Sequence, residues 1–113
     1  MTIRPFVTVL ALLFLSTAQL AAQIFVITPN GGGGTTTVEM DTHNPGKCYV
    51  TTGGTTSHVN WDTSGDDIRI MDQTGAVNTV LKDANNNNPE ATGDATTAAG
   101  VQFGTWERLE LNP

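Results

Sequence analysis

The chain has 113 residues, of which 5 are basic and 11 acidic, and its only cysteine is Cys48. This length allows one domain, and the lone cysteine excludes an internal disulfide, so its thiol is either buried or free to pair between chains. The acidic balance opposes binding to nucleic-acid phosphates and to anionic membranes, so we expect neither partner.

The first residues have the layout of a secretory signal peptide. Arg4 provides a positive start, residues 6–15 are apolar, and small and polar residues lead to Ala22. The apolar stretch is shorter than the roughly 20 residues of a comfortable membrane span. The alternative is a retained anchor, because Leu20 is larger than the residue preferred near a cleavage site. We predict a signal peptide over residues 1–22, and an extracellular or periplasmic protein with no membrane association after cleavage.

The segment that follows the predicted cleavage site combines a strand with a tether. An apolar, β-branched strand begins at Gln23 and ends at Thr28, and four glycines occupy residues 31–34. We therefore predict an N-terminal strand and glycine-rich tether over residues 23–34, followed by a β-rich domain over residues 35–113. Such a tether would let the strand swing away from its own domain.

The rest of the chain alternates short β-type runs with turn signals. The predicted strands cover residues 35–41, 47–52, 57–63, 67–72, 77–81, 101–103 and 105–111. Residues 82–99 are polar and are predicted to form one long loop, and Gly104 is predicted to divide the last two strands. With no helical periodicity, the sequence predicts an all-β fold, a small antiparallel β-sandwich or a barrel-like domain.

Two stretches resemble a fascin-like β-trefoil repeat. The first runs from Gly46 to Thr51 (GKCYVT), and the second runs from Ile68 to Leu111 and ends in GTWERLEL. The resemblance implies a partial β-trefoil as the alternative fold, with sugar or actin binding through loops. The chain is too short for three repeats, and Leu109 stands where the repeat has an aromatic residue.

The asparagine-rich stretch offers a tentative calcium site. Asp83, Asn85, Asn87 and Asp94 fall at positions 1, 3, 5 and 12 of a twelve-residue frame, and hard oxygen ligands at this spacing suit calcium. Asn88 replaces the glycine expected at position 6. The alternative is a solvated polar loop, so calcium is the one cofactor that the sequence suggests, and none is certain.

Aromatic residues offer a candidate ligand site. Trp61 alternates in phase with Val59 and is predicted to be core, whereas Trp106 alternates in phase with Arg108 and is predicted to be at the surface. Exposed aromatic rings stack on sugar rings. We predict ligand binding by Trp106, Tyr49 and Arg108.

The sequence contains no arrangement that indicates catalysis. Ser57 and His58 are neighbours in a predicted strand, so their side chains point to opposite faces. The predicted mature chain, residues 23–113, has 91 residues, and a chain of this size rarely supplies the walls of a deep active site. We therefore predict that the protein is not an enzyme.

Two functions remain. The first is a secreted, non-catalytic binding module for a glycan or cell-surface partner. The second is a self-assembling structural subunit of an extracellular fibre, coat or matrix, which would form homo-oligomers by adding the strand from Gln23 to Thr28 to a neighbour's sheet.

Overall fold

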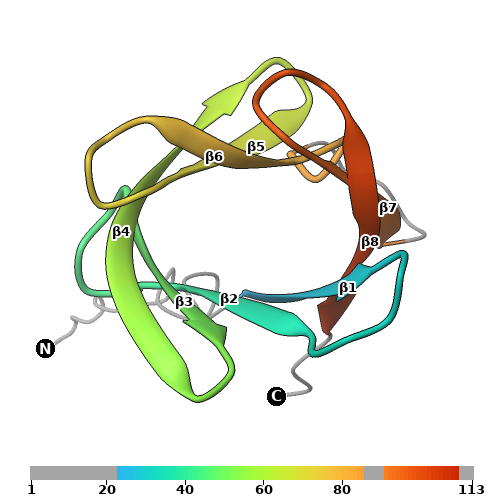
Figure 1. Ribbon diagram of the computed structural model, residues 1–113. Helices are drawn as coiled ribbons and strands as arrows, with labels where there is room; N and C mark the ends of the chain where they lie inside the picture. The colour runs from blue at the N-terminus through green and yellow to red at the C-terminus, as the bar shows by residue number, and fades with distance from the viewer. Residues whose placement is uncertain (1–22, 86–90, 110–113) are drawn as a thin grey trace, which may run out of the picture.

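The computed structural model describes residues 23–85 and 91–109, which form a closed barrel of eight antiparallel strands (Figure 1). Each strand pairs with the next along the chain, and β1 pairs with β8 to close the barrel. The strands are β1 (Ile24–Pro29), β2 (Thr36–Met40), β3 (Lys47–Thr52), β4 (Thr55–Ser64), β5 (Asp67–Met71), β6 (Val77–Leu81), β7 (Thr92–Thr96) and β8 (Gln102–Leu109).

The predicted signal peptide, residues 1–22, lies outside the described residues. The described part of the chain contains no helix with the length and apolar character needed to cross a membrane.

Two-residue turns connect β3 to β4 and β4 to β5. The β3–β4 hairpin turns on Gly53 and Gly54, whose φ angles are 59° and 84°. A two-residue hairpin turn of this kind needs positive φ at both positions, which glycine adopts without steric cost. The turn fixes the register of the hairpin, in which Thr52 pairs with Thr55 and Tyr49 pairs with His58.

The core lies inside the barrel and is built by alternation along the strands. Phe25 and Ile27 of β1 and Ile68 and Ile70 of β5 are buried, while the residues between them are more exposed. Side chains at every second position of a strand share one face, so each strand contributes its apolar set to the interior. The other buried apolar residues are Val38, Cys48, Val59, Leu81, Ala84, Ala95 and Trp106.

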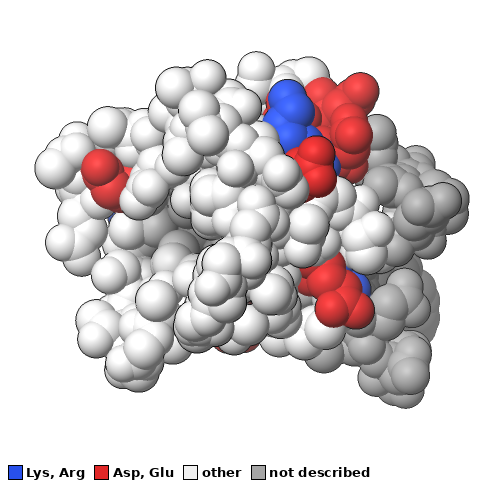
Figure 2. Space-filling model, turned by 45° about the vertical axis from the view of Figure 1, so that its right-hand side comes forward, with Lys and Arg blue, Asp and Glu red and all other residues white. Residues whose placement is uncertain are grey.

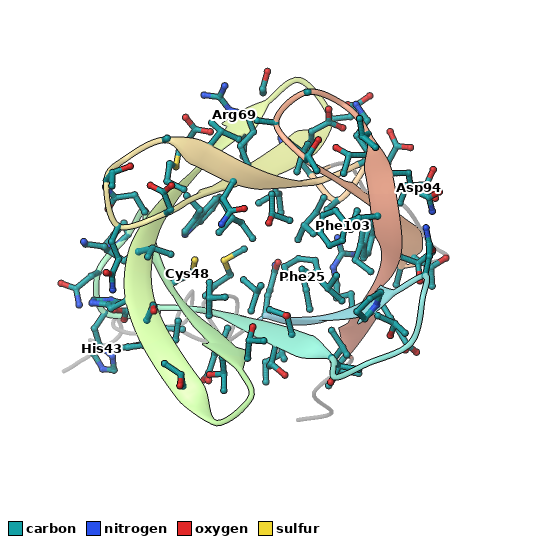
Figure 3. All side chains as sticks on the ribbon, viewed as in Figure 1. Phe25, His43, Cys48, Arg69, Asp94 and Phe103 are labelled. Carbon is teal, nitrogen blue, oxygen red and sulfur yellow. The ribbon has the colours of Figure 1, made fainter. Side chains whose placement is uncertain are left out.

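The all-β prediction is confirmed, and of the expected architectures the barrel is the one that forms. Eight strands enclose an interior just wide enough for side chains to fill. Figure 3 shows these side chains converging from all sides of the barrel, with Phe25 and Cys48 among them.

The prediction of one long loop over residues 82–99 is wrong, because β7 lies within it. β7 pairs with β8 from Thr92 to Thr96, with Gly93 opposite Trp106. β7 has almost no apolar pattern, because the Trp106 ring of β8 fills the part of the barrel interior that lies next to it. A Cβ added at Gly93 would lie 2.6 Å from the indole Nε1 of Trp106, so a small residue is required there.

The predicted division of the last strand at Gly104 is also wrong, since β8 is continuous from Gln102 to Leu109. Gly104 pairs with Pro29 of β1 and with Ala95 of β7. A Cβ at this position would lie 2.4 Å from the carbonyl oxygen of Thr28. The glycine therefore marks a close approach between β8 and β1, not a break in the strand.

The N-terminal strand is part of the barrel. β1 pairs with β2 on one side and with β8 on the other, so both of its edges are occupied. The boundary predicted between residues 34 and 35 therefore does not separate β1 from the domain in this structure. The glycines at residues 31–34 form the connection between β1 and β2.

The β4 strand is shared between two neighbours. Its first part, residues 55–60, pairs with β3, whereas residues 61–64 pair with β5 and the register ends at Trp61 and Ile70. The side of residues 55–60 that faces away from β3 is therefore not covered by β5. We call this stretch the open edge of β4.

Candidate functional site

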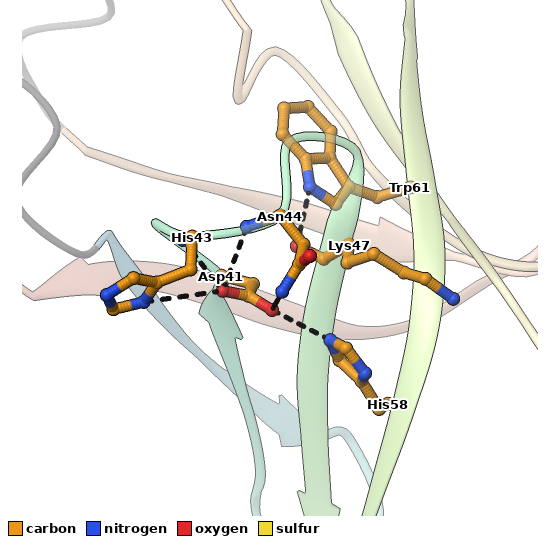
Figure 4. A network of polar contacts seen from close by, with 6 residues as sticks. All are labelled: Asp41, His43, Asn44, Lys47, His58 and Trp61. Atoms are coloured by element: carbon orange, nitrogen blue, oxygen red, sulfur yellow. Dashed lines mark hydrogen bonds and ion pairs between the residues drawn. The ribbon is translucent and has the colours of Figure 1, made fainter.

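A polar network at the end of β2 reaches His58 of β4 (Figure 4). His58 belongs to an aromatic pair on the outer face of the barrel. Asp41 directly follows β2, and its side chain is only 3% exposed. Its Oδ1 accepts hydrogen bonds from the backbone N–H groups of His43 and Asn44 at 2.8 and 3.2 Å, and its Oδ2 accepts one from Asn44 Nδ2 at 2.9 Å. Asp41 therefore organises the turn between β2 and β3, as aspartate commonly does in turns.

The same carboxylate reaches across to β4. The Nε2 atom of His58 lies 2.8 Å from Asp41 Oδ2. Hydrogen bonds from the Asn44 side chain, the His43 backbone, His58 and the Asn44 backbone hold the pKa of Asp41 far below its ordinary value, although burial opposes this shift. The carboxylate stays ionised and can fix the orientation of the His58 ring.

His58 in turn stacks on Tyr49. The two residues are cross-strand partners, and their ring centroids lie 4.4 Å apart with an interplanar angle of 13°. Tyr49 is 39% exposed and the His58 side chain 38% exposed. The result is an oriented aromatic pair that faces solvent, which we call the Tyr49–His58 plate.

The geometry of the plate suits binding more than nucleophilic chemistry. A hydrolase of the serine type needs a hydroxyl within reach of the oriented imidazole. Ser57 lines a hollow on the inner side of the sheet together with Val50 and Val59, whereas His58 reaches Asp41 on the outer face. The nearest serine in the sequence therefore points away from the imidazole.

Of the three predicted ligand-binding residues, Tyr49 lies at the surface and Trp106 does not. Trp106 is 1% exposed, and its Nε1 donates a hydrogen bond to the carbonyl oxygen of Lys82 at 2.9 Å. Its ring meets Phe25 edge-on with a centroid distance of 5.7 Å. The prediction that Trp106 is a surface residue is wrong, because the alternation in β8 turns it inward and leaves Leu109 at the surface.

Arg108 lies beside Trp106 and away from Tyr49. Its guanidinium carbon lies 5.4 Å from the centroid of the Phe25 ring and 5.7 Å from that of Trp106, and its Nη2 donates to the carbonyl oxygen of Ala84 at 2.7 Å. Its Nε is buried without a hydrogen-bond partner. The three predicted residues thus do not form one site, because Tyr49 belongs to the outer face and the other two to the barrel interior.

The described members of the predicted calcium frame lie on separate elements. Asp83 has a φ of 63° and donates its backbone N–H to Asp67, while the Asn85 side chain donates to the carbonyl oxygen of Gly65. Asp94 lies in β7, and Asn87 lies outside the described residues. Because position 12 of the frame belongs to a paired strand, these residues do not form the single twelve-residue ligand loop that the sequence predicted. Among the described residues, no group of three His, Cys, Asp or Glu side chains could hold a metal ion.

Asp62 of β4 and Asp67, the first residue of β5, form ion pairs. Arg69 donates to both carboxylate oxygens of Asp62, at 2.7 and 2.6 Å, and Lys82 donates to Asp67 at 2.7 Å. The hydrogen bond from Arg69 lowers the pKa of Asp62. The contacts from Lys82 and the Asp83 backbone outweigh the effect of burial and lower the pKa of Asp67. The pairs tie adjacent strands together at the surface.

Cys48 is fully buried within the barrel. Burial raises the pKa of its thiol to about 11, although Lys47 opposes the shift. The sequence left open whether this thiol is buried or free to pair between chains, and in the structure it is buried.

Charged residues do not form one continuous surface on the face shown in Figure 2. Most of this face is uncharged, and the acidic residues are scattered over it in small groups, with basic residues beside some of them. The net negative charge of the chain therefore does not define a binding patch on this face.

The plate could not be found by pattern alone. Asp41 and His58 are 17 residues apart, and only the pairing of β2 with β3 and of β3 with β4 brings them together. The detectable signal was the register implied by the Gly53–Gly54 turn, which places Tyr49 opposite His58.

Comparisons with protein-family models, with curated proteins and with solved structures found no match to this chain.

Proposed function

We propose that the protein is a non-catalytic binding module that acts outside the cell and contacts a glycan or cell-surface partner through the Tyr49–His58 plate. The observation that carries this proposal is the stacked pair itself, which is exposed to solvent and held from behind by the buried carboxylate of Asp41. An aromatic ring with a fixed orientation loses little entropy when it stacks on a sugar ring.

The residues around the plate support a polar ligand. On the outer face of the sheet, Tyr49 pairs with Glu39 of β2, and Lys47 pairs with Asn60 of β4. Thr51 and Thr56 share a hydrogen bond between their hydroxyl groups at 2.8 Å. Hydroxyl, amide and charged groups around a single aromatic surface provide the few oriented polar contacts that a sugar needs.

The test is binding of the mature protein to an array of neutral and acidic oligosaccharides. Tyr49→Ala should weaken binding about tenfold, because it removes the stacking surface, and Tyr49→Phe should retain most of the affinity. Thr96→Ser, a conservative change on β7 away from the plate, is the matched control and should bind like the unmodified protein.

Two results would contradict the proposal. Binding that survives Tyr49→Ala would remove the plate as the site. A complete absence of binding to any oligosaccharide would remove glycan as the ligand class.

A self-assembling structural subunit is the second candidate. The predicted donor, the strand from Gln23 to Thr28, is paired on both edges, so donation of β1 would open the barrel. The observation that favours assembly is instead the open edge of β4, which carries no Lys, Asp, Glu or Pro to block strand addition. Light scattering over a wide concentration range tests this candidate, and a constant monomer mass would contradict it.

A further inference from the structure

The open edge of β4 presents unpaired backbone groups to solvent. The backbone N–H of Trp61 donates to the carbonyl oxygen of Gly46, so Trp61 points its backbone groups toward the β3 side. In an antiparallel ladder these directions alternate along the strand. The N–H and C=O groups of His58 and Thr56 therefore point away from β3, toward a space where β5 has already ended.

A hollow of about 360 Å³ lies on the inner side of this edge. Its apolar lining comes from Val50, Val59, Ile70 and Met71, and uncharged polar groups come from Ser57, Gln73, Thr74, Asn78 and Thr79. The one charged residue in the lining is Asp72, whose Oδ1 already accepts hydrogen bonds from the Thr74 and Ala76 backbones. This inner hollow thus suits an uncharged, apolar side chain.

A second hollow of about 390 Å³ lies on the outer side of the same edge. It is lined by Lys47, His58 and Asn60 and shares Val59 and residues 72–74 with the inner hollow. His58 is engaged with Asp41. The Lys47 ammonium forms no ion pair or side-chain hydrogen bond with the described residues, whereas Arg69 and Lys82 are both paired. Asp72 also lines this hollow, and its Oδ1 is engaged by the backbone N–H groups of Thr74 and Ala76, so among the described residues the Lys47 ammonium is the charged group there without a partner.

The two hollows flank one strand edge, which is the arrangement that binds an added strand. Successive side chains of an extended peptide point to opposite sides. A peptide that continued the ladder beyond β5 would bond to His58 and Thr56 through its backbone and would place alternate side chains in the two hollows.

We propose that the open edge of β4 is a docking site for an extended peptide in which apolar side chains flank an acidic one. The apolar side chains would occupy the inner hollow, and the carboxylate would pair with Lys47 in the outer hollow. The site is separate from sugar stacking on Tyr49, and the inference does not depend on it.

A peptide fits this edge better than a second copy of the protein. Only Thr56 and His58 offer both backbone groups, and the β5–β6 turn bounds one end of the edge through residues 72–74. A second barrel that paired through the same edge would bring its own β5–β6 turn and crowd the edge. A single extended peptide has no neighbouring strand or turn to accommodate.

The test uses fluorescein-labelled peptides of the sequence Ser-Thr-Val-Glu-Val-Thr-Ser and a matched peptide with lysine in place of glutamate. Fluorescence anisotropy should show about tenfold tighter binding of the glutamate peptide, equivalent to about 1.4 kcal/mol. This preference is diagnostic because the chain has a formal charge of −6, so long-range attraction alone would favour the lysine peptide. Lys47→Glu should reverse the preference.

A second variant tests the backbone contacts. Thr56→Pro removes an N–H group that faces the open edge and not the β3 ladder, a position at which an edge strand tolerates proline. It should weaken both peptides, while Thr56→Val should bind like the unmodified protein. Circular dichroism of each variant confirms that the barrel has formed.

The proposal is overturned if neither peptide binds, or if Lys47→Glu leaves the preference unchanged. Self-association that is blocked by Thr56→Pro, without peptide binding, would assign the edge to a second copy instead. Loss of sugar binding in Tyr49→Ala with peptide binding retained would show that the two sites are independent.

Discussion

The two sides of the barrel are closed in different ways. Where β1 and β8 meet, the ladder runs along the whole of β1, from Ile24 to Pro29, and Trp106 and Phe25 fill the space behind it. Where β4 and β5 meet, the ladder covers residues 61–64 of β4, and the rest of β4 extends beyond the end of β5.

The difference lies in how the interior is packed. At the β1–β8 side the Trp106 ring is matched by glycines where neighbouring strands approach, so the interior is filled there, and the hollow of about 510 Å³ on this side is lined mainly by polar residues of β1, β7 and β8. At the β4–β5 side the strand edge is left between two hollows. We infer that the first side supplies stability and the second supplies surface for recognition, since binding sites need unsatisfied groups that a well-packed side does not have.

Removing Trp106 should have the largest effect on stability. Trp106→Ala deletes a buried ring that contacts Phe25, and such truncations cost about 3–5 kcal/mol in the free energy of unfolding. Trp61→Ala is the matched comparison, because Trp61 is half-buried on the β4 side, and it should cost clearly less. Chemical denaturation measures both, and equal losses would contradict the proposed difference between the two sides.

Adding one methyl group beneath the Trp106 ring should have a smaller effect. A Cβ at Gly93 would lie 2.6 Å from Trp106 Nε1 and 2.7 Å from the Lys82 carbonyl oxygen, so Gly93→Ala should destabilise by about 1–3 kcal/mol. Gly31→Ala, with no atom near its Cβ position, should change the free energy of unfolding by less than about 0.5 kcal/mol. Thermal unfolding compares the two, and similar melting temperatures would refute the close-packing explanation.

The Asp41 network should make stability depend on acid pH. The pKa of Asp41 is lower in the folded state than its ordinary value of 3.8, so folding favours the ionised form. This contribution is present above about pH 4 and is lost as the pH falls further. Asp41→Asn should therefore lower the melting temperature near neutral pH. On acidification, the melting temperature of this variant should fall less than that of the unmodified protein.

The exposed carboxylate of Glu39, on the same strand, provides the control for this measurement. Glu39→Gln should follow the unmodified protein across the acid range, because Glu39 lies at the surface outside the Asp41 network. If Asp41→Asn retained the full acid dependence, other carboxylates such as Asp62 would have to be its source.

The sequence predicted most of the strands, because alternating apolar residues and turn residues are properties of neighbouring positions. The predicted strand over residues 67–72 has its apolar residues at alternate positions, and the structure buries two of them, Ile68 and Ile70. The same reasoning failed for β7, which contains Gly93 where a strand normally carries a larger residue. Trp106 of β8 explains that glycine, and no local pattern in β7 predicts that a tryptophan will lie opposite it.

The candidate site was predicted only in part. Tyr49 was predicted to bind a ligand, and its exposure at the surface makes it available to one. Trp106 was placed on the wrong side, because its phase was judged from Arg108, a charged residue that the barrel holds over two aromatic rings. A charge normally marks the outer face, and here its apolar stem and planar head lie inside.

By itself the sequence determined that this protein is all-β, acidic and built from short strands, since alternation, turn residues and charge are properties of neighbouring positions. Only the tertiary structure decided that the strands close into a barrel and that β1 belongs to it. It also decided that Asp41 contacts His58 and that β4 extends beyond the end of β5. These features depend on which strands meet and how far they overlap, and backbone pairing between distant segments sets both.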